Sequence, residues 1–440
     1  MGEVVSAPIV HWLRGLGSGV GGFHQSVLVS VPGALGAGAL VGAVQAVVDH
    51  HDALRLRLGV SGVDGGWGLE VGPVGSVSAG GCVRRVDVSG GDAGVLSELV
   101  RVEADAARGR LAPERGVMVQ VVWFDAGEER AGRLLLVVHH LVVDGVSWRV
   151  ILPDLEAAWR CVVAGERPVL EAVGTSYRAW AGLLPGLALR RESELPLWEG
   201  MLAQGDVLLS SRVLDPVVDV AGSACSVSVE VPAGVTSALL TWVPGVWGAG
   251  VEEVLLAGLG VAVSRWRGVR GVGGGGLLVD LEGHGREQVV DGLDLSRTVG
   301  WFTSRYPVCL DVDGVGVGGA VKRVKEVLRG LPDRGMGFGL LRYLSPGAGE
   351  VLAGLPEPQV GFNYLGRFAA GGGDWSPVGE AGGIGGGVDP SMRMPHALEV
   401  NALTLDGAEG SVLSAVWAWP GGLFGEGEVE ELAREWVRVL

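Results

Sequence analysis

The stretch "VVHHLVVDGVSWRV" (Val137–Val150) decides the fold, because it carries polar side chains inside a run that is otherwise apolar. Side chains alternate across an extended strand, so His139 and His140 face opposite sides. Apolar neighbours line both sides, which predicts a strand over Leu134–Val143 that is buried on both faces. Burial desolvates an imidazole, which lowers its pKa and leaves it neutral and able to accept a proton near pH 7.

His139 and His140 are expected to have different roles. For His139 we favour a satisfied core residue, since its side chain cannot serve the cavity that His140 faces. For His140 we favour a functional role, because Asp144 and Gly145 turn the chain out of the strand, and sites are often built at strand ends and in the loops after them. Asp144 itself is expected to be structural, because a buried carboxylate beside a turn normally pairs with an arginine and holds the loop.

A second histidine pair, His50 and His51 in "DHHDALR", lies at the end of a predicted helix beside arginines. No apolar strand surrounds this pair, so capping or solvated histidines are the favoured interpretation. The apolar surroundings, more than the pairing itself, therefore mark the first pair as the candidate site.

Length, composition and charge exclude several classes of protein. The chain of 440 residues is too long for one compact core, so two domains of roughly 200 residues each are expected, with 48% hydrophobic residues to bury. The net charge of -16 argues against nucleic acid or an anionic membrane as a partner, since this surface must on average repel phosphates. The N-terminus has no basic segment followed by an apolar run, and no stretch approaches about 18 uninterrupted apolar residues, so a soluble cytoplasmic chain is expected.

The cysteines and lysines argue against bound metals and one common cofactor. The four cysteines lack CxxC spacing and lie in apolar contexts, so we expect small buried hydrophobes without a disulfide framework or a zinc site: Cys82, Cys161, Cys225 and Cys309. Only Lys322 and Lys325 are lysines. A pyridoxal-phosphate enzyme needs a pocket lysine for its Schiff base, and this chain offers almost no candidate.

Periodicity predicts mixed α/β structure in both halves of the chain. Strands are expected over Val117–Phe124, over Leu134–Val143 and in "LLVDLEG"; helices are expected around Leu40–Val48, Val95–Arg108, Val251–Trp266, Val321–Leu328 and Glu428–Val439, with another opened by Pro153. The segment Pro185–Pro196 mixes proline, glycine and charge, so we place the inter-domain connection there, between residues 1–185 and 186–440. Glycine-rich Ala369–Asp389 is expected to be a mobile surface loop. The two halves are similar in size and in mixed α/β content, which suggests related lobes with a site in the cleft between them.

A second candidate site is "LLVDLEGHGREQ" (Leu277–Gln288), a predicted strand followed by closely spaced ionisable residues. Asp280 and Glu282 share one face of the strand. Such groups are costly after an apolar strand unless they pair or take part in chemistry. A salt-bridged turn is a credible interpretation for Arg286 and Glu287, whereas Glu282, at the last strand position, is the better catalytic candidate.

Two further stretches mix aromatic and polar residues: "RTVGWFTSRYPV" (Arg297–Val308) and "QVGFNYLGRF" (Gln359–Phe368). Polar residues such as Asn363 and Tyr364 suggest pocket walls with a few hydrogen-bonding groups. Taken alone, both stretches could equally be ordinary core strands.

Together the four stretches resemble the signature motifs of the epimerization domains of nonribosomal peptide synthetases, within the condensation-domain superfamily. "HHLVVDG" marks only the superfamily, while "EGHGRE" combined with "FNYLGR" resembles the epimerizing branch. The resemblance runs from "PIVHWL" (Pro8–Leu13) to the final helix. Two departures are visible: Val10 stands where members usually carry glutamine, and Phe338 where they usually carry tyrosine. Both lie outside the presumed chemistry and could affect packing or carrier docking. Met1 leads straight into the first motif, which suggests a piece excised from a larger synthetase.

The resemblance implies an α/β fold of two chloramphenicol-acetyltransferase-like lobes, forming a V-shaped pseudo-dimer with a central tunnel. A peptidyl carrier protein would bring an aminoacyl or peptidyl thioester on its phosphopantetheine arm, beside neighbouring synthetase domains. The α-carbon would then be equilibrated between the L and D configurations. No metal or organic cofactor is implied. Because carriers are commonly acidic and this chain is too, docking would need a local arginine patch.

The resemblance also assigns roles to individual residues. His140 and Glu282 are the expected acid/base pair at the tunnel, and which of them removes the L proton stays open. Asn363 and Tyr364 are candidate donors to the thioester or its enolate. The expected supporting residues are His139, Asp144 and Arg286, with Ser147 and Asp154 as weaker assignments. The alternatives are a condensation domain that forms peptide bonds, and a non-catalytic relative that recruits partners.

Overall fold

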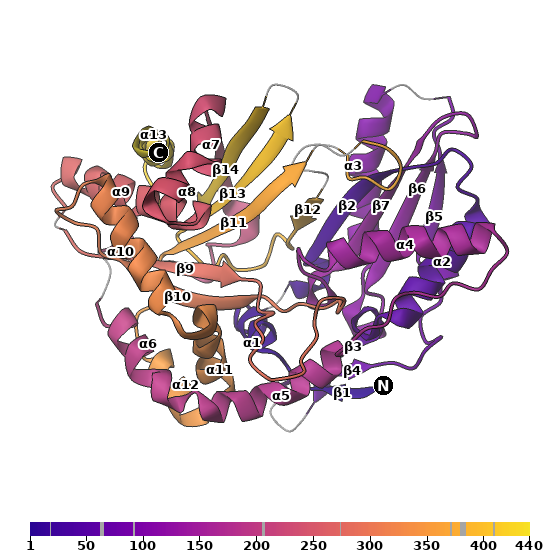
Figure 1. Cartoon of the computed structure of the whole chain (residues 1–440), viewed down its shortest axis with the longest axis horizontal. Helices are drawn as coiled ribbons and strands as arrows, with labels where there is room; N and C mark the ends of the chain where they lie inside the picture. The colour runs from indigo at the N-terminus through magenta and orange to yellow at the C-terminus, as the bar shows by residue number, and fades with distance from the viewer. Residues whose placement is uncertain are drawn as a thin grey trace.

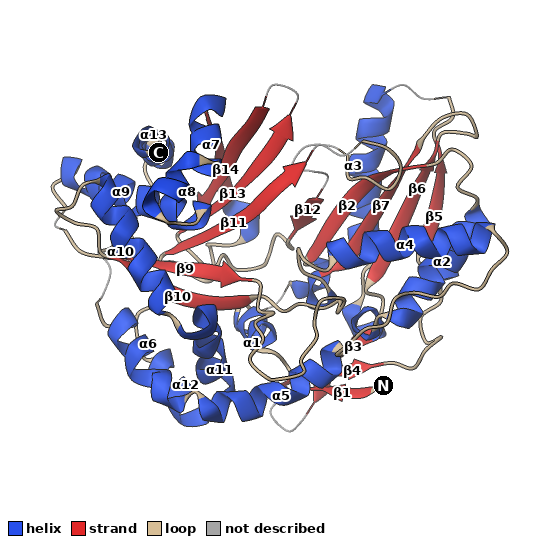
Figure 2. Ribbon diagram, viewed as in Figure 1, coloured by secondary structure: helices blue, strands red, loops and turns tan. Residues whose placement is uncertain are grey.

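The computed structural model describes residues 1–17, 19–61, 66–90, 93–204, 207–272, 274–369, 372–378, 384–407 and 410–440. The chain forms two lobes, each built on one large β-sheet with helices packed against it (Figure 1, Figure 2). The first lobe holds a five-stranded sheet in the order β12-β2-β7-β6-β5, and the second a six-stranded sheet in the order β10-β9-β11-β13-β14-β8. A small sheet, β1-β4-β3, lies beside the first lobe. The predicted α/β fold of two lobes is confirmed.

In the first lobe, helices cover both faces of the sheet. Leu136 and Val138 of β7 belong to the core under α2 and α4, while Leu135 and Val137 pack with α3 on the opposite face. The strand of the "HH" stretch is therefore buried on both sides, as its apolar pattern predicts. The elements of this lobe are β1 (Gly2–Val4), β2 (His24–Val31), α2 (Ala37–His50), β3 (Leu56–Ser61), β4 (Gly66–Val71), β5 (Val83–Asp87), α3 (Ala93–Arg110), β6 (Val119–Asp125), β7 (Gly132–His139) and α4 (Trp148–Val163).

Two predicted boundaries near the motif are wrong. β7 ends at His139, and His140 begins a 3₁₀ turn that runs to Val142, so strand alternation does not extend through Val143. The His140 N–H still donates to the Phe23 carbonyl at 2.9 Å, in register with β2, and the turn is closed by the Val143 N–H, which donates to the His140 carbonyl at 3.4 Å. Helix α4 begins at Trp148, and Pro153 lies inside it rather than at its start. The side chain of Asp144 accepts from the Ser147 N–H at 2.8 Å and closes the turn that leads into this helix.

The second lobe buries its own core between the six-stranded sheet and its helices. Helix α9 contributes the largest run of buried residues, and α10 and α13 pack beside it. The helices predicted over Val251–Trp266, Val321–Leu328 and Glu428–Val439 are confirmed. The elements of this half are β8 (Ala224–Val231), α7 (Ala233–Leu240), α8 (Trp242–Trp247), α9 (Val251–Val269), β9 (Leu277–Gly283), β10 (Ser304–Leu310), α10 (Val317–Gly330), α11 (Met336–Leu344), α12 (Pro346–Ala353), β11 (Val360–Ala369), β13 (Leu398–Gly407), β14 (Gly410–Pro420) and α13 (Glu428–Val439).

The connections between the lobes differ from the predicted loops. Pro185 lies inside α5 (Tyr177–Arg190), and the chain continues through α6 (Leu195–Leu202), so the expected connection is helical. The glycine-rich stretch contributes β12 (Ile384–Gly387), which pairs antiparallel with β2 in the first lobe. Trp375 from the same stretch is buried, and its N–H donates to the Ser30 carbonyl at 2.7 Å. This part of the predicted surface loop is instead an edge of the first lobe; residues 370–371 and 379–383 lie outside the described residues.

Three other expectations can be compared with the structure. Cys82 and Cys309 are buried as predicted, whereas Cys161 is partly exposed and Cys225 is exposed. Over the described residues, no single helix is long and apolar enough to span a membrane; only the bent pair Ala233–Trp247 and Val251–Val269 passes a length and composition test, with a 96° break. Helix α1 (Pro8–Gly15) buries Val10, and Phe338 packs edge-on against Trp198 at 5.5 Å between ring centroids, so the two departures from the motif pattern lie in packed positions.

Candidate functional site

His139 is enclosed and has a partner for each ring nitrogen. Its Nε2 lies 2.8 Å from the Val20 carbonyl, and its Nδ1 accepts from the Leu141 N–H at 3.2 Å. The neutral ring therefore carries its proton on Nε2. Burial lowers the pKa of His139 to about 4. These contacts place His139 in the scaffold that shapes the turn around His140.

His140 lies in an aromatic setting at the start of the 3₁₀ turn. Its ring stacks on Phe23 at 4.6 Å between centroids and lies 4.7 Å from the Trp301 ring. Burial lowers the pKa of His140 to about 4, although the nearby Asp144 carboxylate and the backbone favour the protonated ring. The side chain is therefore neutral at pH 7 and chemically able to accept a proton.

A crossing loop, His284–Thr303, joins β9 to β10 and packs against the first lobe. Arg286 of this loop places its Nη2 3.0 and 3.1 Å from the two carboxylate oxygens of Asp144. The other Asp144 contacts include the Phe302 N–H at 3.2 Å, and Ser147 Oγ donates to the Gly300 carbonyl at 3.0 Å. The "HHLVVDG" and "EGHGRE" motifs, far apart in sequence, are thus joined by a buried ion pair.

Gly285 allows the crossing loop to leave β9. It has a φ of +65°, and a Cβ built there would lie 1.7 Å from the Phe302 carbonyl oxygen. Only glycine fits a left-handed conformation with so close an approach. Gly285 of "EGHGRE" therefore lets the start of the crossing loop lie directly against the Phe302 carbonyl near the end of the loop.

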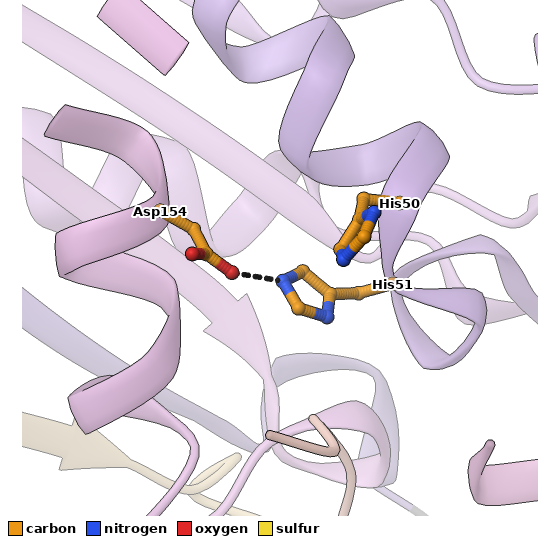
Figure 3. Close-up of side chains that lie close together, drawn as sticks. All are labelled: His50, His51 and Asp154. Carbon is orange, nitrogen blue, oxygen red and sulfur yellow. Dashed lines mark hydrogen bonds and ion pairs between the residues drawn. The ribbon is translucent and has the colours of Figure 1, made fainter. Parts of the chain in front are cut away.

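His51 and Asp154 are joined by a buried hydrogen bond (Figure 3), and Asp154 also connects to the crossing loop. His51 Nε2 lies 2.9 Å from one Asp154 oxygen, and Arg297 of the loop pairs with the other. His51 occupies the C-cap position of α2, as the capping interpretation expects, but the solvated interpretation is wrong for it, because its surface is only 2% exposed. Because α4 begins at Trp148 and not at Pro153, Asp154 lies inside the helix, where it bonds to His51.

The donor atoms of His50, His51 and Asp154 lie within 4.8 Å of one another, close enough for a metal ion. They are already engaged, however: His50 Nε2 lies 2.8 Å from the Glu171 carbonyl, and Asp154 bonds to both His51 and Arg297. A guanidinium on the same carboxylate repels a divalent cation. The donor set therefore fits an ion-pair network better than a metal site.

Glu282 lies near the end of β9, where the crossing loop begins. Asn363 Nδ2, from the neighbouring strand β11, donates to Glu282 Oε2 at 3.0 Å. Burial raises the pKa of Glu282, and Arg305, its register partner on β10, offsets only part of this effect. Its proton affinity is therefore higher than that of an ordinary glutamate.

A buried charge network surrounds Glu282. Arg305 Nη2 lies 2.7 Å from Asp280 Oδ2 and 3.1 Å from His396 Nε2, and His396 Nδ1 lies 3.3 Å from Glu399. Burial opposes ionisation of Asp280 and Glu399, but the basic partners outweigh it and keep the pKa of each below its usual value. The same two carboxylates raise the pKa of His396. Of the three carboxyl groups in this network, only that of Glu282 has a raised pKa.

Aromatic contacts connect His140 with the surroundings of Glu282. Trp301, which touches His140, meets Trp12 edge-on at 6.5 Å between centroids, and the Arg305 guanidinium lies 4.0 Å over the Trp12 ring. Arg305 is in turn the register partner of Glu282. Residues from α1, the crossing loop and β10 thus lie between the two candidate acid/base groups.

Tyr364 does not join this group. Strand alternation places it on the face opposite Asn363, where it packs against the core of the second lobe. Its hydroxyl lies 3.0 Å from Thr404 Oγ1. Of the two predicted donors on β11, only Asn363 contacts Glu282.

Sequence reasoning missed Gln25, Arg305 and His396 as site residues. Gln25 contacts His140 from 115 positions away, and His396 contacts Asp280 from 116 positions away. Arg305 lies inside a quoted aromatic stretch, and its charge amid that apolar strand was the available signal. Gln25 and His396 offered no comparable local pattern.

Comparison with known proteins identifies the family. A family model described as the condensation domain matches residues 103–440. The chain belongs to the condensation-domain family. A linear gramicidin synthase protein of Brevibacillus parabrevis is 38% identical over 348 residues, which cover 78% of this chain and 4% of that protein. Surfactin synthase subunit 2 of Bacillus subtilis is 32% identical over 350 residues, covering 78% of this chain and 9% of that protein. This condensation-family chain therefore spans only a small part of these relatives.

Solved structures agree with the condensation-family fold over the whole chain. The epimerization domain from the third module of tyrocidine synthetase B has a TM-score of 0.84 at 26% identity, covering 100% of this chain and 96% of that one. The X-domain from teicoplanin biosynthesis has a TM-score of 0.72 at 20% identity, covering 99% and 93%. The first condensation domain of the calcium-dependent antibiotic synthetase has a TM-score of 0.67 at 20% identity, covering 99% and 94%. The last two show the fold alone.

Proposed function

We propose that this condensation-family domain is an epimerase of nonribosomal peptide synthesis. It inverts the α-carbon of an aminoacyl or peptidyl thioester on the phosphopantetheine arm of a peptidyl carrier protein. The observation that carries the proposal is Glu282, a carboxyl with a raised pKa that contacts Asn363 where the crossing loop leaves β9. Amide formation does not require such a carboxyl, whereas inversion at carbon needs a second acid/base group. The likeness to the tyrocidine epimerization domain supports the same assignment.

The chemistry needs a base, an acid and a place for negative charge. The α-proton leaves to one group, and the electron pair moves onto the thioester oxygen as an enolate. A proton then returns to the opposite face of the carbon. His140 is neutral at pH 7 and Glu282 has an increased affinity for a proton, so the two groups suit this exchange. Asn363 is the candidate donor to the enolate oxygen.

The proposal extends to partners, cofactors and location. The carrier protein and neighbouring synthetase domains would be the partners, as membership in the condensation family and the synthase relatives suggest. The described acid/base groups supply the proton chemistry, so we propose that the domain itself needs no cofactor. We place the domain in the cytoplasm, because the free thiols of Cys82, Cys161 and Cys225 agree with a reducing setting.

Two substitutions test the acid/base assignment. A carrier protein loaded with an L-aminoacyl or peptidyl thioester is incubated with the domain in deuterated water, and α-deuterium incorporation is followed by mass spectrometry. We expect His140→Ala and Glu282→Gln each to slow incorporation by roughly 10²–10⁴-fold, the usual range for removing a general acid or base.

Matched controls use the same substitutions at other positions. His50→Ala removes a histidine outside the four motifs, whose hydrogen bond to the Glu171 carbonyl is exposed, and Glu350→Gln changes an exposed glutamate on α12. Both should exchange deuterium at the unaltered rate. If the unaltered domain formed an amide with a second loaded carrier and gave no exchange, the condensation alternative would replace the proposal. Carrier binding without either reaction would favour the non-catalytic relative.

A further inference from the structure

Gln25 on β2 bridges His140 and a buried tryptophan. Its Oε1 accepts from Trp148 Nε1 at 2.8 Å, and its Nε2 lies 3.0 Å from His140 Nε2. An indole nitrogen can only donate a hydrogen bond, so the Gln25 oxygen must be the atom that faces Trp148. The amide nitrogen of Gln25 therefore faces the His140 ring.

This orientation determines the proton distribution on His140. The amide nitrogen of Gln25 can only donate, so His140 Nε2 must present its lone pair. A neutral imidazole has one N–H, which then lies on Nδ1. Nδ1 is buried and has no hydrogen-bond partner among the described residues. The contact with Gln25 therefore selects the tautomer.

His139 shows that this tautomer is not a general property of the turn. Its Nδ1 accepts from the Leu141 N–H, so its proton lies on Nε2. Two adjacent histidines thus carry their protons on different nitrogens, and for His140 the side chains of Gln25 and Trp148 make the choice.

We propose that Gln25 is a positioning residue that, oriented by Trp148, holds His140 in the tautomer whose Nε2 lone pair serves the reaction at the α-carbon. The inference rests on the proposed epimerase function. As the Cα–H bond breaks, the single Nε2 lone pair gives up the hydrogen bond from Gln25 and binds the proton, and the electron pair of the Cα–H bond moves onto the thioester oxygen. The new Nε2–H then opposes the N–H of Gln25, so their hydrogen bond is lost. This loss favours return of the proton from the imidazolium.

The tautomer can be read without any activity. NMR of the chain labelled with ¹⁵N-histidine reports the protonation of each ring nitrogen, and the His140 signals are assigned as those missing in His140→Ala. We expect an unprotonated Nε2 and a protonated Nδ1 for His140. Gln25→Glu nearly preserves shape but replaces the donor with a second acceptor. It should move the proton to Nε2 and raise the pKa of His140. Gln204→Glu, which adds the same charge at an exposed glutamine, should leave the His140 signals unchanged.

Activity supplies a second readout. Gln25→Glu should slow deuterium incorporation by roughly 10²-fold or more, because the lone pair no longer lies on the reacting nitrogen. The acid limb of its pH profile should also shift to higher pH, which a merely structural defect would not cause. Trp148→Phe keeps Gln25 but removes the group that orients its amide, so it should give mixed tautomers and an intermediate rate.

The outcomes separate this inference from the proposed function. A protonated Nε2 in the unaltered chain would overturn the inference even if exchange is fast. An unprotonated Nε2 that is unaffected by Gln25→Glu would also overturn it, because Gln25 would then not set the tautomer. Absence of exchange in the unaltered chain would overturn the proposed function and the use of Nε2 in it, while the NMR result would still report the tautomer.

Discussion

At the scale of single residues, two adjacent histidines differ because of their partners. His139 has both nitrogens satisfied by backbone groups, whereas His140 faces an aromatic pair and Gln25. The pKa of each is lowered to about 4, first of all by burial. The two histidines therefore have similar pKa values, and they differ in the groups that their rings contact.

The buried His139 predicts a specific loss of stability in acid. Its pKa of about 4 in the folded chain is below the ordinary value of 6.5, so the unfolded chain binds more protons between these values. Its contribution is fully present above pH 6.5 and is lost as the pH falls towards 4. Between pH 7 and 4 the free energy of unfolding should fall by about 3 kcal/mol more in the unaltered chain than in His139→Gln.

Urea unfolding at several pH values measures this difference. His284→Gln, at an exposed histidine, should keep the pH dependence of the unaltered chain. An equal loss of stability between pH 7 and 4 in His139→Gln and the unaltered chain would contradict this role of His139.

At the scale of elements, the crossing loop brings the two motifs together. Asp144 and Asp154 of the first lobe hold it through Arg286 and Arg297, and Trp301 of the loop covers His140. The expected ion pair between Asp144 and an arginine of the second motif is present. Glu282 lies on β9 just before this loop begins. Displacement of the loop would therefore change the surroundings of both candidate acid/base groups.

Removal of Arg286 should cost far more than removal of a surface arginine. Arg286→Met leaves the Asp144 carboxylate buried without its cation, which should lower the free energy of unfolding by about 3 kcal/mol. Arg101→Met breaks an ion pair with Glu98 in which the side chains are 65% and 61% exposed, and should cost far less because solvent screens this pair. Chemical denaturation compares the two. Equal costs would show that the crossing loop is not held by this pair.

Local sequence pattern predicts elements better than their ends. The helix over Glu428–Val439 is found with the predicted bounds, because an amphipathic stripe is a property of the segment itself. The end of β7 depends on the His139 side chain, which accepts from the Leu141 N–H, and the start of α4 depends on the Asp144 side chain. Neither partner belongs to the periodic pattern, so the predicted boundaries at Val143 and Pro153 were wrong.

At the scale of the whole molecule, segments of the second half complete the first lobe. β12 adds an edge to the first sheet, and the crossing loop packs against α4 and the motif turn. Sequence alone divided the chain at Pro185–Pro196, where proline, glycine and charge suggested a connection, and assigned glycine-rich Ala369–Asp389 to a loop. The contacts His51–Asp154, Gln25–His140 and Asp280–His396 each span more than a hundred positions, so no local pattern could reveal them.

The most direct test of the proposed epimerase is the approach to equilibrium at the α-carbon from both sides. Carrier proteins loaded with the L thioester and with the D thioester are incubated separately with the unaltered domain in deuterated water, and chirality and α-deuterium are measured over time. We expect the same final mixture of L and D from both starting materials, with deuterium at the α-carbon of the inverted product. Retention of configuration and of the α-proton in both reactions would contradict the proposed function.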